Sequence, residues 1–84
     1  MKNLVEFTRD YLESNYGLAE RLAKSKVAPE EGKEFAQMIL EQSYGAVDGL
    51  VAWQNYRRDP EKFVDPLIAL WDEYHEKFNQ LLEK

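Results

Sequence analysis

Cysteine is absent from this chain of 84 residues. This absence excludes a disulfide framework, a thiolate metal site and a cysteine nucleophile. No apolar run reaches the roughly 18 residues that a membrane span needs, and the first residues lack the charged and then apolar layout of a signal peptide. We therefore expect a cytoplasmic protein with no membrane partner, whose stability depends on apolar packing.

Sequence patterns typical of catalysis are also missing. The chain has one histidine, His75, no glycine-rich phosphate loop and no sequence context for a Ser-His-Asp triad. Asp72 and His75 match half of the carboxylate–histidine pattern of di-iron bundles, but no second pair exists and the acids lie on outward faces. We predict neither an enzyme nor a bound metal or cofactor, and expect His75 to lie at the edge of the bundle beside Trp71 and Leu82, with Asn79 as a hydrogen-bond partner.

Signals for β-structure are scarce. Few residues are β-branched, period-two alternation is absent, and no Asn-Gly or Asp-Gly hairpin turn occurs. Apolar residues instead recur at helical spacing in three segments, and an aromatic content of 13% argues against disorder. The sequence therefore predicts one all-α domain over residues 1–84.

The longest apolar pattern, residues 29–58, predicts a long central helix. Pro29 stands in its first turn, where a missing N–H is tolerated, and two arginines end it, as the helix dipole favours. Its broad apolar arc contains Phe35, Ala36, Ile39, Leu40, Ser43, Ala46, Val47, Leu50, Val51, Trp53 and Gln54.

The first helix is predicted over residues 3–24. Asn3 can cap its N-terminus. Its apolar arc contains Leu4, Phe7, Tyr11, Leu12, Leu18, Ala19, Leu22 and Ala23. Thr8 and Asn15 interrupt this arc and need hydrogen-bond partners: a carbonyl one turn back for Thr8, and a helix crossing or water for Asn15.

The third helix is predicted over residues 66–82. Asp-Pro pairs occur at residues 59–60 and 65–66, and each pair is a helix start signal. Because Pro66 disfavours helical geometry at the residue before it, we expect residues 60–64 to form a separate short helical turn, with Phe63 and Val64 closing the end of the bundle. Short links make successive helices antiparallel, so the sequence predicts an up-down-up three-helix bundle.

The charge balance bears on the class of partner. A net charge of −5 opposes attraction to nucleic acid or anionic lipid. Arg57, Arg58 and Lys62 form one basic island beside aromatic residues, but two arginines at a helix end are explained by its dipole. We therefore predict no nucleic-acid binding.

The apolar surface of the central helix is wider than two neighbouring helices need. Tyr44 projects from its polar side close to Val51, and Met38 and Tyr56 flank the main stripe on the other side. Aromatic residues on polar surfaces are frequent interface anchors. We predict a small acidic protein–protein interaction module, an adaptor, inhibitor or accessory regulator, with Met38, Tyr44, Val51, Trp53 and Tyr56 as contact candidates.

Other functions remain open at this point. A small-ligand or cofactor carrier could use an aromatic pocket of Trp53, Trp71, Tyr74, His75 and Phe78. An acidic decoy could compete with nucleic acid for a basic protein through its rows of carboxylates. A homodimer is a further possibility, because Gly45 and Gly49 leave room on the central helix for a second backbone, from this chain or from another copy.

Overall fold

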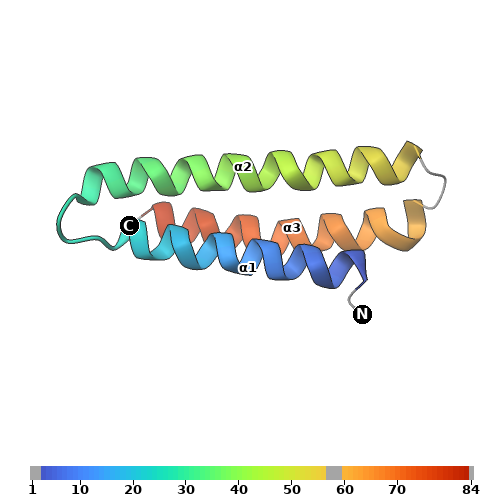
Figure 1. Ribbon diagram of the computed structural model, residues 1–84, viewed down its shortest axis with the longest axis horizontal. Helices are drawn as coiled ribbons and strands as arrows, with labels where there is room; N and C mark the ends of the chain where they lie inside the picture. The colour runs from blue at the N-terminus through green and yellow to red at the C-terminus, as the bar shows by residue number, and fades with distance from the viewer. Residues whose placement is uncertain (1–2, 57–59, 84) are drawn as a thin grey trace.

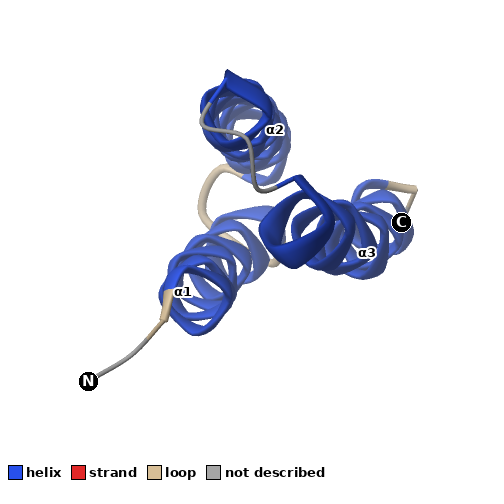
Figure 2. Ribbon diagram, turned by 90° about the vertical axis from the view of Figure 1, so that its right-hand side faces the viewer, coloured by secondary structure: helices blue, strands red, loops and turns tan. Residues whose placement is uncertain are grey.

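The computed structural model describes residues 3–56 and 60–83, with side chains over 3–56 and 64–83, and these residues form three α-helices: α1 (Leu4–Ala23), α2 (Pro29–Tyr56) and α3 (Pro60–Leu82). The helices lie lengthwise in a molecule of 47 × 23 × 16 Å, with successive helices antiparallel (Figure 1). Seen end on, they form a triangle in which each helix contacts the other two (Figure 2). The predicted up-down-up three-helix bundle is confirmed.

Local sequence signals set the first helix boundaries. The N–H of Glu6 donates to Oδ1 of Asn3 at 2.8 Å, so Asn3 caps α1 as predicted. The chain then turns through a short loop, where Oγ of Ser25 accepts from the N–H of Val27 at 3.3 Å. α2 begins at Pro29, as predicted. Its predicted end at residues 57–58 lies outside the described residues.

The third helix is longer than predicted. α3 continues without a break from Pro60 through Pro66 to Leu82, so residues 60–64 are its first turns and not a separate element. The prediction gave the local preference of Pro66 too much weight. Val64 and Leu67, three residues apart on one face, are only 7% and 0% exposed, and a continuous helix keeps both in the core. The side chain of Phe63 lies outside the described part.

The apolar core runs along the axis of the triangle in two adjoining clusters. Their buried members are Ala19, Ala23, Ala36, Leu40, Phe78 and Leu81 in one cluster, and Leu12, Val47, Leu70 and Tyr74 in the other. Tyr16 and Trp71 pack against both clusters. The ring of Tyr16 meets Phe78 edge-on, with centroids 5.5 Å apart. All three helices therefore share one continuous core.

A polar contact joins α1 to α2 inside this core. Nδ2 of Asn15 donates to Oγ of Ser43 at 3.0 Å, and Oγ of Ser43 donates to the carbonyl of Ile39 at 2.7 Å. Asn15 thus lies at a helix crossing, and Thr8 donates to the carbonyl of Leu4, one turn back, as predicted. Sliding α1 along α2 would remove the donor to the buried Oγ of Ser43 and the partner of the half-buried Asn15, so this pair favours the observed register of the two helices.

A second group of polar contacts joins α1 to α3 at the edge of the bundle. The hydroxyl of Tyr74 donates to Oε2 of Glu13 at 2.5 Å, and Arg9 pairs with Glu73 at 3.2 Å. The ring of Tyr74 is only 2% exposed, and Nζ of Lys77 lies 4.8 Å from its centroid. Burial, then the hydrogen bond to Glu13 and the charge of Glu13, raise the pKa of Tyr74 to about 12.

Gly32 marks the closest approach of α2 to α1. It is buried in the first turns of α2, and a Cβ at this position would collide with the carbonyl oxygen of Leu22. Only glycine therefore fits at position 32 without a shift of the backbone.

We expect Gly32→Ala to lower the free energy of unfolding by roughly 1 to 3 kcal/mol, because the added methyl group meets the backbone of Leu22. Gly17→Ala is the matched control: beyond the adjacent backbone of α1, a Cβ at Gly17 would meet no atom of the described residues within 4 Å, and alanine should stabilise α1 by about 1 kcal/mol. Urea unfolding followed by circular dichroism measures both changes. Equal effects in the two variants would contradict the close approach at Gly32.

We expect alkaline pH to destabilise the protein through Tyr74. Because its pKa is raised in the folded state from 10.0 to about 12, the folded chain keeps this proton longer than the unfolded chain. Protonated Tyr74 therefore contributes about 2 to 3 kcal/mol to the free energy of unfolding. This contribution is complete below pH 10 and is lost as the pH rises to 12. Urea unfolding at intervals across this window should show a steeper decline for the wild type than for Tyr74→Phe. Identical declines would contradict the prediction.

Candidate protein-binding surface

A row of large apolar side chains stays exposed where α1 and α2 lie side by side. Its exposed members are Phe7, Tyr11 and Leu18 on α1, and Phe35 and Trp53 on α2. The α1 residues are spaced i, i+4 and i+11, which places them on one stripe of the helix. Two adjacent helices thus present apolar stripes to the same side of the bundle.

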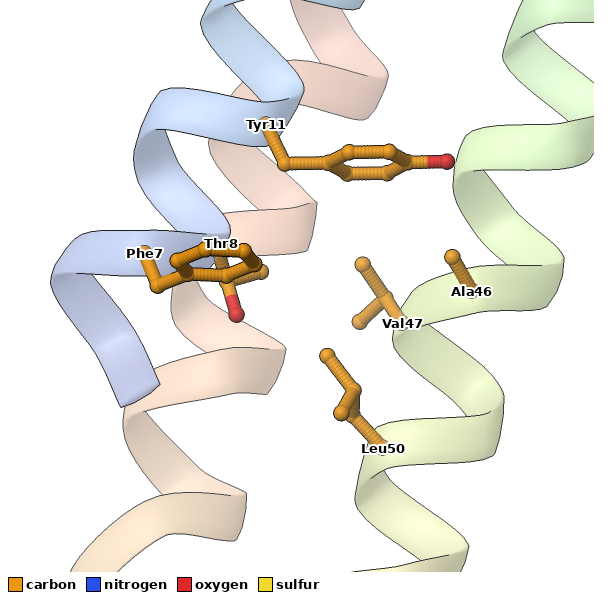
Figure 3. A pocket seen from close by; sticks show the side chains of 6 residues that line it. All are labelled: Phe7, Thr8, Tyr11, Ala46, Val47 and Leu50. Atoms are coloured by element: carbon orange, nitrogen blue, oxygen red, sulfur yellow. The ribbon is translucent and has the colours of Figure 1, made fainter. Parts of the chain in front are cut away.

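An apolar pocket of about 300 Å³ lies in the groove between these stripes. Its lining consists of Phe7, Thr8, Tyr11, Ala46, Val47 and Leu50, and we call this set the α1–α2 groove. Figure 3 shows the ring of Tyr11 reaching from α1 toward α2, where Val47 and Leu50 point back at α1. The hydroxyl of Thr8 already donates to a backbone carbonyl. The groove therefore suits an apolar side chain better than a polar ligand.

The exposed side of α2 next to this groove carries no charge. Between Phe35 and Tyr56 the only charged residues are Glu41 and Asp48. Both lie toward α3, since each lines a hollow beside Trp71. The arc of α2 away from these two carboxylates, which we call the outer face of α2, consists of the exposed residues Phe35, Met38, Gln42, Gly45, Gly49, Trp53 and Tyr56, with the half-buried Ala46 at its edge.

The five predicted contact candidates divide between two sides of α2. Met38, Trp53 and Tyr56 belong to the outer face, where all three are exposed. Tyr44 and Val51 lie on the side toward α3. The ring of Tyr44 was expected on a polar surface; it is 55% exposed, and its centroid lies 5.6 Å from the ring of Trp71. The five residues therefore do not form one patch.

The aromatic residues considered for a ligand pocket are also dispersed. Tyr74 and Phe78 are buried in the core, and Trp53 lines neither of the two hollows beside Trp71. The ring of His75 stacks on Trp71 with centroids 5.5 Å apart, and its Nε2 lies 3.4 Å from Nδ2 of Asn79. The expected contacts of His75 with Trp71 and Asn79 are confirmed.

The described residues contain neither a cluster of metal-ligating side chains nor a membrane-spanning helix. Within them, no three His, Asp or Glu side chains gather as a metal site would require. No helix in the same residues combines the length and the apolar character needed to cross a bilayer. Of the basic island, Arg57 and Arg58 lie outside the described residues, as does the side chain of Lys62.

Sequence reasoning missed the exposure of Phe7, Leu18 and Phe35. It placed them on the apolar arcs, but each is more than half exposed. The buried residues of α1, which include Leu12 and Ala19, centre on a direction roughly 110° or more from Phe7 and Leu18 around the helix. The width of the predicted apolar arcs could have indicated this exposure, because two neighbouring helices do not cover arcs that wide.

Comparison with known proteins identifies no relative: no protein family, curated protein or solved structure matches the chain. The function is therefore inferred from the surface itself.

We expect Phe7→Ala to change the free energy of unfolding by less than about 1 kcal/mol, because the side chain is 65% exposed. Leu12→Ala is the comparison within the same helix. Its side chain is fully buried, so truncation should lower the free energy of unfolding by about 2 to 5 kcal/mol. Urea unfolding at low protein concentration measures both. A loss at Phe7 as large as that at Leu12 would place Phe7 in the core and contradict the proposed surface.

Proposed function

We propose that this protein acts by binding another protein chain along the outer face of α2 and the α1–α2 groove. The observation that carries the proposal is the exposure of large apolar side chains on the outer face of α2, which carries no charged residue between Phe35 and Tyr56. Contiguous apolar surface is uncommon on soluble monomers outside binding sites. Aromatic residues and methionine, which dominate this surface, are the types enriched in protein interfaces.

The shape of the surface favours a helical segment as the bound element. The groove runs along two antiparallel helices, and its pocket accepts one apolar anchor between Tyr11 and Leu50. A helix bound there would pack beside α1 and α2 as a fourth helix. It would contact them through its own apolar residues at positions i, i+3, i+4 and i+7. The net charge of −5 supports a protein partner over nucleic acid.

In this proposal the protein is an adaptor, inhibitor or accessory regulator in the cytoplasm. It needs no chemistry of its own, because its effect follows from occupying a surface of its partner. The two alternatives have weaker support. The hollows beside Trp71, of about 280 and 240 Å³, are not lined by Trp53, Tyr74 or Phe78, which a ligand carrier was expected to use. The carboxylates expected for an acidic decoy are partly engaged, as at Glu13 and Glu20.

Site-specific photo-crosslinking in the native host tests the proposed surface. A benzophenone amino acid in place of Phe7 should give a discrete covalent adduct with one protein, because this position borders the groove. The matched control carries the same amino acid in place of Glu76, which is exposed on α3 and lies opposite its buried stripe. No adduct at position 7, or the same adduct from both positions, would contradict the proposal.

A further inference from the structure

We propose that the bound chain is a second copy of this protein, whose α2 lies antiparallel on the outer face of α2 about a two-fold axis between Gly45 and Ala46. This inference rests on the proposed function, since it names the partner of the same surface.

The order of large and small residues along the outer face supports the two-fold axis. Phe35 and Tyr56 lie equally far from the midpoint of Gly45 and Ala46, each about 16 Å along the helix. Met38 and Trp53 also lie equally far from that midpoint. In an antiparallel pair, Phe35 would therefore face Tyr56 of the second copy. A closed dimer of this kind requires a self-complementary surface, and this arrangement provides one.

Charge also favours a second copy. Each chain carries a net charge of −5, so two copies repel unless they meet where carboxylates are absent. The outer face meets this condition, because Glu41 and Asp48 lie toward α3. The charged groups of a strongly charged partner would lose their hydration at this face without forming an ion pair. The same uncharged face of another copy avoids both penalties.

Space and length are compatible with this pairing. Beyond the adjacent backbone of α2, a Cβ at Gly45 would meet no atom of the described residues within 4 Å, so packing within the described part of the chain does not require glycine there. Small residues at the midpoint allow two helices to approach until the large residues at both ends touch. Phe35 and Tyr56 lie about 32 Å apart along α2, so two paired helices would be in contact over most of the 47 Å length of the molecule.

Sedimentation equilibrium of the purified chain from about 1 μM to about 1 mM tests the inference. The wild type should approach twice the chain mass as concentration rises. Gly45→Glu should weaken association by about 100-fold or more, because two carboxylates would meet near the axis. The Cβ at Gly45 points into open space, so this variant should still fold, and circular dichroism verifies it. A monomer throughout, or association unchanged in Gly45→Glu, would overturn the inference.

Gly17→Glu is the matched control. It adds the same charge at an open mid-helix glycine of α1, and it should leave the dimer intact. Equal weakening by both variants would indicate a general charge effect and overturn the inference. If the host adduct at Phe7 contains a different protein while the purified chain stays monomeric, the proposed function stands and only the second copy is wrong.

Introduced cysteines test the antiparallel orientation, because the chain has none of its own. Under mild oxidation Gly45→Cys should link rapidly to its copy, since position 45 lies beside the axis. Met38→Cys should not, because the two copies of position 38 would be about 22 Å apart along the helices. Linking at position 38 as fast as at position 45 would indicate a parallel pair and overturn this arrangement.

Discussion

A helix in a three-helix bundle has only two neighbours, and this constraint governs the structure. α1 and α3 cover the sector of α2 that contains Ala36, Leu40 and Val47, and no third helix covers the rest. Amphipathic helices match this limit when their apolar stripe is narrow. α2 does not match it, because uncharged residues continue around to Met38 and Tyr56, both exposed. The apolar surface of α2 is therefore wide enough to contact one more helix in addition to α1 and α3.

Polar contacts decide which part of α2 remains uncovered. The Asn15–Ser43 hydrogen bond favours the observed rotation and register of α2 against α1, because the fully buried Oγ of Ser43 accepts from Asn15 only in this arrangement. On the other side of the bundle, the Tyr74–Glu13 bond fixes α3 against α1. With both neighbours fixed in this way, rotating α2 to bury its outer face would break the first contact and expose the core. The exposed apolar side is thus a consequence of the same contacts that make the fold specific.

The sequence predicted those features that depend on local signals. The number of helices, the cap at Asn3 and the start of α2 at Pro29 follow from residues adjacent in the chain. The start of α3 was mispredicted because two effects compete there: the backbone preference at Pro66 and the burial of Val64, which requires knowledge of the packed bundle. The candidate site was predicted only in part. Met38, Trp53 and Tyr56 lie on the outer face, but the exposure of Phe7 depends on where α2 sits relative to α1.

The outer face of α2 also contains residues that a bundle without a binding partner would not need. A domain of this size has little stability to spare, yet Gly45 and Gly49 weaken the middle of its longest helix without any neighbour in the described chain that needs the space. Gly32, by contrast, is required by the contact with Leu22. Most residues of a natural protein suit its fold, and residues that do not suit it are expected mainly at functional sites. Both departures, the unneeded glycines and the exposed Phe35, Trp53 and Tyr56, fall on the same side of α2, and contact with a further helix would account for both.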